Sequence, residues 1–143
     1  MNLKNFWSFF LLIGLFSCGG SPYYKELSQL LKQHEKSIQD YEYIAVINVD
    51  ACISCMDIVK KFLHENNSNP QLLTVLVSAS SKKINLLVGS LSEEVILRDV
   101  KMESIYDFEL VDMQPVIYSV YGTEVEQRVI LLTDLLDGVF FYY

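Results

Sequence analysis

The sequence predicts an α/β sandwich in which helices flank a central mixed β-sheet. Two apolar runs, 43–49 and 72–77, are typical of strands buried on both faces. Amphipathic patterns with helical spacing lie on both sides of the first run. After Pro115, two β-rich runs enclose a glycine turn, which is the signature of a hairpin. Strands mixed with helices in this way predict a layered α/β domain.

The helices are expected where apolar residues recur at helical spacing, over 23–41 and 56–65. Asp50 is placed to cap the second of these helices. A third helix is expected over 91–100, with Ser92 as its cap.

Besides the two buried runs, a third strand is expected over 84–88. The hairpin should join 116–120 to 125–132 through the turn at 121–124.

Residues 1–17 have the features of a signal peptide. Lys4 supplies a positive charge, and the apolar stretch 6–16 has the length of a signal-peptide core. It is shorter than the roughly 20 residues of a membrane span. The core ends in Ser17-Cys18, which resembles the lipobox of bacterial lipoproteins, whose cysteine receives a diacylglyceryl group and becomes the new N-terminus. An ordinary secretory signal or a short anchor is the alternative.

The lipobox resemblance implies that residues 18–22 form a lipidated cysteine and a short tether, and that 23–143 form one domain. Gly19 is not the aspartate that holds some lipoproteins at the inner membrane. A cell-envelope location at the outer membrane, facing the periplasm, is therefore favoured. The net charge is −7 and no basic run is present, which argues against nucleic acid or an anionic lipid surface as a partner.

Cys52 and Cys55 are the other cysteines of the chain, which has three. In an oxidising compartment, two cysteines this close form a disulfide unless something keeps them reduced. Their spacing at the start of a helix suits dithiol exchange, because the helix N-terminus favours a thiolate. Cys52 is expected to attack, and Cys55, one turn further, to resolve the mixed disulfide.

A strand, a CxxC and a helix, followed far along the chain by Gln114-Pro115 and a hairpin, resemble the thioredoxin superfamily. In that family a cis-proline loop faces the CxxC, and two antiparallel strands follow it. The resemblance covers about 24–143 and implies a cis Pro115, with Gln114 offering its backbone to the substrate chain. The alternative for Pro115 is an ordinary proline at a strand edge. A trans bond would remove the thioredoxin-like assignment and return the CxxC to the alternatives below.

Two departures from the family bear on the activity. Ala51 replaces the usual aromatic residue, and Ile53-Ser54 replace the Gly-Pro that many members carry. No basic residue or histidine lies between the cysteines to stabilise a thiolate, which favours a reductant over a strong oxidant. The expected activity is thiol–disulfide exchange without a cofactor or metal. The expected partners are protein thiols or disulfides and an upstream electron donor.

Two alternatives stay open. The first is a thioredoxin-like lipoprotein with little catalysis that acts as a binding module. The second is a copper or zinc carrier, because a strand at 84–88 would match the element order of small ferredoxin-like carrier domains. Two thiolates suit Cu(I), whereas a closed zinc site needs four ligands. His64 is expected to face solvent.

The lipobox generates a prediction about anchoring. Replacing Cys18 by alanine removes the thiol that would carry the lipid, so the protein should move from the membrane fraction to the soluble fraction. Mass spectrometry of the wild-type protein should find Cys18 as a modified N-terminus. An unmodified Cys18 in the wild type would contradict this prediction.

Overall fold

The computed structural model describes residues 21–51, 56–89, 91, 96–98, 110, 112–131 and 133–137. These residues form an α/β fold with a five-stranded mixed sheet. The strands are β1 (Tyr43–Asn48), β2 (Leu72–Val77), β3 (Ile96–Leu97), β4 (Val116–Tyr121) and β5 (Glu124–Val129).

The sheet has the order β3-β2-β1-β4-β5. β1, β2 and β3 run parallel to one another, while β4 runs antiparallel to β1 and to β5. The predicted mixed sheet, both buried runs and the hairpin are therefore confirmed. Gly122 in the hairpin turn has a φ of +64°, a conformation that favours glycine.

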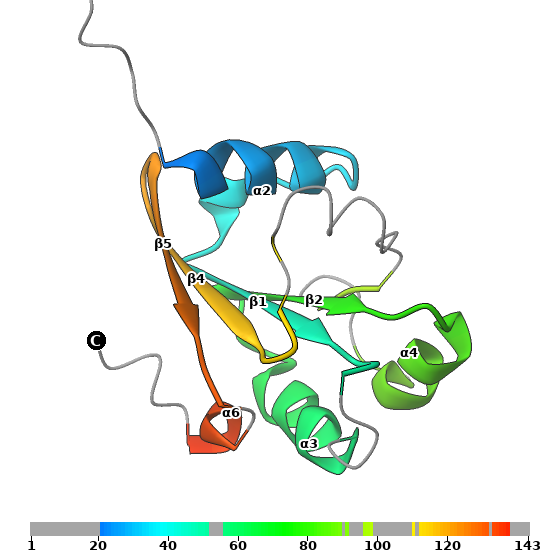
Figure 1. Cartoon of the computed structure of the whole chain (residues 1–143). Helices are drawn as coiled ribbons and strands as arrows, with labels where there is room; N and C mark the ends of the chain where they lie inside the picture. Colours follow the sequence, from blue (N-terminus) through cyan, green and yellow to red (C-terminus); the bar gives the residue numbers. More distant parts are fainter. Residues whose placement is uncertain are drawn as a thin grey trace, which may run out of the picture.

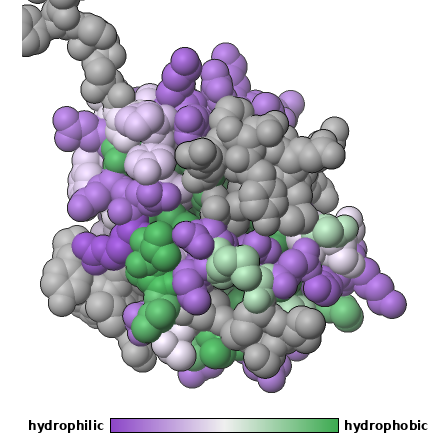
Figure 2. Space-filling model, in the orientation of Figure 1, coloured by the Kyte–Doolittle hydropathy of each residue, from purple (hydrophilic) through white to green (hydrophobic). Residues whose placement is uncertain are grey.

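Helices lie on both faces of the sheet (Figure 1). They are α2 (Pro22–Lys32), η3 (Ile38–Asp40), α3 (Met56–Asn66), α4 (Ser81–Val88) and α6 (Asp134–Asp137). α2 covers one face, and α3, α4 and α6 lie on the opposite face. In Figure 2, the surface over α2 at the top of the view is mainly hydrophilic or near-neutral, and hydrophobic residues are exposed below it.

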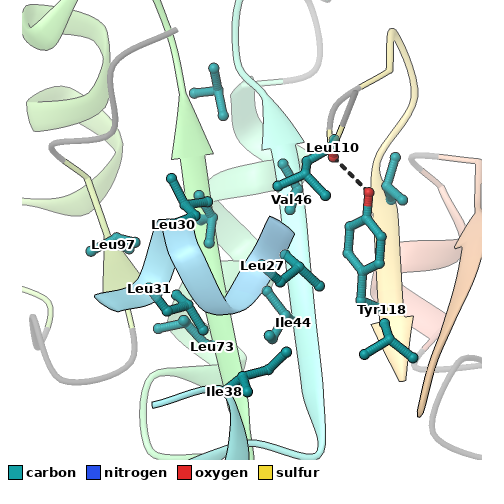
Figure 3. Packing of buried hydrophobic residues seen from close by; sticks show 14 residues of the cluster. Leu27, Leu30, Leu31, Ile38, Ile44, Val46, Leu73, Leu97, Leu110 and Tyr118 are labelled. Atoms are coloured by element: carbon teal, nitrogen blue, oxygen red, sulfur yellow. Dashed lines mark hydrogen bonds between the residues drawn. The ribbon is translucent and has the colours of Figure 1, made fainter. Parts of the chain in front are cut away.

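β1 explains why the first strand reads as a continuous apolar run. Ile44 and Val46 belong to the core under α2, whereas Ala45 and Ile47 belong to the core under α3 and α4. Successive side chains of a strand point to opposite faces, so both sets must be apolar when helices cover both faces. Figure 3 shows the α2 side of this arrangement.

The predicted strand at 84–88 is wrong, because these residues lie in α4. Ile84, Leu87 and Val88 are buried, while Asn85 and Leu86 are exposed. This is the spacing of one helical face, and it prevails over the β-prone composition. The helix is followed by Gly89 with a φ of +53°, a conformation that favours glycine at a helix end.

The predicted helix over 91–100 is also wrong where the structure describes it. Ile96 and Leu97 form β3 and pair with Thr74 and Val75 of β2. Ser92 lies outside the described residues. The pairing satisfies backbone groups on the outer side of β2, a long-range requirement that periodicity does not reveal.

The N-terminal helix is shorter than the predicted 23–41. α2 ends at Lys32, and the chain turns at Glu35, whose φ is +58°. The Lys36 N–H donates to the Leu31 carbonyl at 3.0 Å, which closes this turn. Ile38 then reaches the core from η3 instead of from a continuous helix.

Tyr118 joins the α2 face of the sheet to the chain at Leu110. Its hydroxyl donates to the Leu110 carbonyl at 2.9 Å (Figure 3) and accepts from Gln127 Nε2 at 3.2 Å. The Tyr23 ring packs against the Tyr118 ring with centroids 5.7 Å apart. Tyr118 and Leu110 are both fully buried, so water does not replace these hydrogen bonds.

We predict that Tyr118→Phe lowers the free energy of unfolding by about 1–2 kcal/mol, because it leaves a buried carbonyl unpaired. Urea denaturation measures the change. Tyr121→Phe is the matched control, since Tyr121 is 55% exposed, and it should change stability by less than about 0.5 kcal/mol. Equal effects of the two substitutions would contradict the prediction.

Burial of Tyr118 also raises the pKa of its hydroxyl above the ordinary 10.0. The folded protein therefore keeps a proton that the unfolded chain releases above that pH. This contribution to stability is present below pH 10.0 and is lost as the pH rises above it. Tyr118→Phe should reduce the alkaline loss of stability.

Candidate functional site

The carboxyl end of β1 lies at the point where the order of the strands in the sheet reverses. β2 and β3 follow on one side of β1, and β4 and β5 lie on the other. In open α/β sheets, ligands bind outside the carboxyl ends of strands at such a switch point. This edge is therefore the place to look for a functional site.

Cys52 and Cys55 belong to the connection that starts at this edge. β1 ends at Asn48 and α3 begins at Met56, directly after Cys55. Residues 52–55 lie outside the described residues, and so does Cys18. The expected roles of the three cysteines therefore stay predictions.

The chain that leads to Cys52 is held by hydrogen bonds. The Val49 N–H donates to the Val77 carbonyl at 2.9 Å, which extends the parallel ladder. The Asp50 N–H donates to Asn48 Oδ1 at 3.0 Å, and the Ala51 N–H donates to the Asn48 carbonyl at 3.3 Å. Together these bonds form a turn immediately before the first cysteine.

The Asp50 carboxylate connects this turn to the loop between β2 and α4. It accepts from Ser78 Oγ at 3.0 Å and from the Ala79 N–H at 2.7 Å. Lys83 Nζ, in the first turn of α4, forms an ion pair with it at 2.5 Å. The described partners of the Asp50 carboxylate lie in the β2–α4 region. The N–H groups that Asp50 was predicted to cap belong to residues 52–55, outside the described residues, so that role stays a prediction.

These contacts shift the titration of Asp50. The hydrogen bond from Lys83 lowers the pKa of the Asp50 carboxyl below the ordinary 3.8; partial burial opposes the shift, and the bonds from Ala79 and Ser78 add to it. Sequence reasoning missed this cluster because 33 residues separate Asp50 from Lys83. The one available signal was a lysine shortly after the second predicted strand.

Gln114 and Pro115 reach the same edge of the sheet. Val116, the first residue of β4, lies opposite Val46 of β1, so these two residues precede β4 beside the end of β1. Pro115 is buried and Gln114 is exposed. The structure thus brings them to the edge at which the connection to Cys52 begins.

The predicted cis bond at Pro115 is wrong. No peptide bond among the described residues is cis, so the Gln114–Pro115 bond is trans. The Pro115 carbonyl accepts from the Ile130 N–H at 3.0 Å, so strand-like pairing already begins at the proline. The trans isomer is favoured by about 0.5–1 kcal/mol unless other contacts select the cis form. Pro115 therefore fits the alternative, a proline at the start of a strand.

The two histidines lie apart from this edge. His64 is in the last turn of α3 and is exposed, as predicted. His34 lies in the turn that follows α2. Within the described ranges, no three residues among His, Cys, Asp and Glu are grouped to hold a metal ion.

Comparison with known proteins found no matching family model, no matching curated protein and no matching solved structure. In the part of the chain that the structure describes, no helix has both the length and the hydropathy of a membrane span.

Asp50 generates a prediction about acid stability. Because its pKa is lower in the folded state, its contribution to stability is present above the ordinary 3.8 and is lost as the pH falls below that value. Asp50→Asn should therefore destabilise the protein at neutral pH and flatten the decline of its stability in acid. Thermal unfolding measured between about pH 2 and 7 tests this.

Glu65→Gln is the control, because Glu65 forms an ion pair with Lys61 on the exposed surface of α3. Exposed pairs of this kind contribute little to stability. The role given to Asp50 fails if both variants show the same pH dependence.

Proposed function

We propose that the chain is a lipid-anchored thiol–disulfide exchange protein of the cell envelope. One observation carries the proposal: the connection that holds Cys52 and Cys55 leaves the carboxyl end of the central strand β1 and leads into α3. That end is the switch point of the sheet, where α/β proteins place their sites.

The order of the elements supports this proposal. β1 is followed by α3, β2 and α4, and the parallel strands β1 and β2 pair directly. β4 then pairs antiparallel with β1, and the hairpin to β5 is followed by α6. The resemblance to the thioredoxin superfamily rests on a CxxC after a strand, on the Gln114-Pro115 loop and on the hairpin that follows it. The element order retains the strand before the CxxC and the hairpin, but not a cis-proline loop.

The trans Gln114–Pro115 bond is the outcome that removes the assignment to that family, so the proposal keeps only the position of the two cysteines after β1 and the order of the elements. Substrate binding through a cis-proline loop is therefore not part of the proposal. Pro115 and Gln114 border the edge, but the proposed chemistry depends on the two cysteines.

The exchange proceeds in two steps. The Cys52 thiolate attacks one sulfur of a partner's disulfide, forming a mixed disulfide and releasing the partner's first thiolate. The Cys55 thiolate then attacks the Cys52 sulfur and releases the second thiolate. Two electrons pass to the partner, and a Cys52–Cys55 disulfide forms. An upstream dithiol donor must reduce this disulfide before the next cycle.

The metal-carrier alternative loses the order of strands and helices on which it was based. It required a strand at 84–88, and those residues form α4. The alternative of a binding module with little catalysis is separated from the proposal by the experiment that follows.

Trapping of mixed disulfides tests the assigned roles. Cys55→Ser should accumulate mixed disulfides with envelope proteins, because no resolving thiol remains. Cys52→Ser should accumulate few, because the attacking thiol is gone. Non-reducing gels followed by mass spectrometry measure both. Equal trapping by the two variants would refute the roles, and no trapping by either would favour the binding module.

A further inference from the structure

The ion pair between Asp50 and Lys83 places two opposite charges beside the start of the connection that holds the cysteines. Lys83 Nζ lies 2.5 Å from Asp50 Oδ1. The aspartate side chain is 24% exposed and the lysine side chain is 41% exposed. Both charges therefore act at the surface of the carboxyl edge of the sheet.

The chain itself limits the distance from Asp50 to Cys52. Consecutive Cα atoms are 3.8 Å apart, so the Cα atoms of these two residues are at most about 7 Å apart. Ala51, between them, is held by the bond from its N–H to the Asn48 carbonyl. The screening length at physiological ionic strength is about 8 Å. A change in charge at Asp50 therefore alters the free energy of a thiolate at Cys52.

The other charged residues near this edge are not tied to that turn. Asp57 lies in the first turn of α3, Lys82 lies in the first turn of α4, and Asp112 precedes β4. All three are exposed, and none of them forms an ion pair with a described residue. Asp50 and Lys83 are thus the charged groups that the structure attaches to the turn before the cysteines.

We propose that Asp50 and Lys83 are positioning residues of the exchange reaction, and that together they set how readily Cys52 releases its proton to become the attacking thiolate. This inference rests on the proposed function. The Lys83 ammonium compensates the Asp50 carboxylate, which on its own opposes a second negative charge nearby. The bonds from Ser78 and Ala79 keep the carboxylate in this position.

The two charges act on the thiolate in opposite directions. Lys83→Gln leaves the carboxylate uncompensated, so the Cys52 thiolate should form at a higher pH. Asp50→Asn leaves the ammonium uncompensated, so the thiolate should form at a lower pH. The double variant D50N/K83Q removes both charges and should resemble the wild type. A role in folding alone does not produce opposite shifts that cancel.

The pH dependence of Cys52 alkylation in the full-length protein tests the proposal. Each variant also carries Cys55→Ser, so that Cys52 cannot form a disulfide with Cys55. Mass spectrometry follows the reaction of iodoacetamide with the peptide that contains Cys52. The midpoint pH of alkylation should rise by about 0.5 units or more in Lys83→Gln and fall by a similar amount in Asp50→Asn.

Lys82→Gln is the matched control, because it removes the same charge from the same turn of α4, at a lysine that forms no described ion pair with Asp50. Its shift should be less than half of the shift in Lys83→Gln. Midpoints that move in the same direction in Lys83→Gln and Asp50→Asn, or an equal shift in Lys82→Gln, would overturn the proposal.

The trapping of mixed disulfides separates this inference from the function on which it rests. If Cys55→Ser traps partner proteins while all charge variants share one midpoint, the exchange function stands and the role of the ion pair fails. If the midpoints shift as expected but neither cysteine variant traps a partner, the exchange function fails, and the role in the reaction fails with it.

Discussion

β1 is the strand on which the remaining layers depend. It is paired on both edges, and its side chains enter both cores. Each valine or isoleucine side chain of this strand that is removed from water contributes roughly 1.5–3 kcal/mol. A strand covered on both faces has no room for polar residues, so chemistry must be placed where the strand ends. Asn48, the last residue of β1, and Asp50 carry the first polar side chains at this end, and the two cysteines follow in the sequence.

The Asp50 cluster shows how this edge is fixed without apolar burial. Ser78 and Ala79 supply donors from the adjacent parallel connection, and Lys83 supplies the charge. Because carboxyl ends of parallel strands meet at one edge, residues far apart in sequence share this carboxylate. The turn before Cys52 is thereby attached to the residues that follow β2 and to α4.

Local patterns predicted those elements whose burial is visible within a few residues. β1 and β2 are predicted by continuous apolar runs, α3 by apolar residues at helical spacing, and the hairpin by two β-rich runs around a glycine turn. α4 is not predicted because Ile84, Leu87 and Val88 lie within a short β-prone run. Their helical spacing extends over too few residues to outweigh that composition. β3 was missed because two residues form a strand only by pairing with β2. The Asp50–Lys83 pair and the trans bond at Pro115 depend on tertiary contacts, which no window of sequence contains.

The hydrogen bond from Ser21 to Val125 has a consequence for how the molecule stands on a membrane. It fixes the start of the domain at the hairpin end of the sheet, where β4 ends and β5 begins (Figure 1). If Cys18 carries a lipid, only two residues lie between it and Ser21, so the hairpin end lies within about 10 Å of the lipid attachment. The carboxyl end of β1 is at the other end of β4, roughly 20 Å further away. The sheet would then act as a spacer that turns the cysteine-bearing edge toward the aqueous compartment.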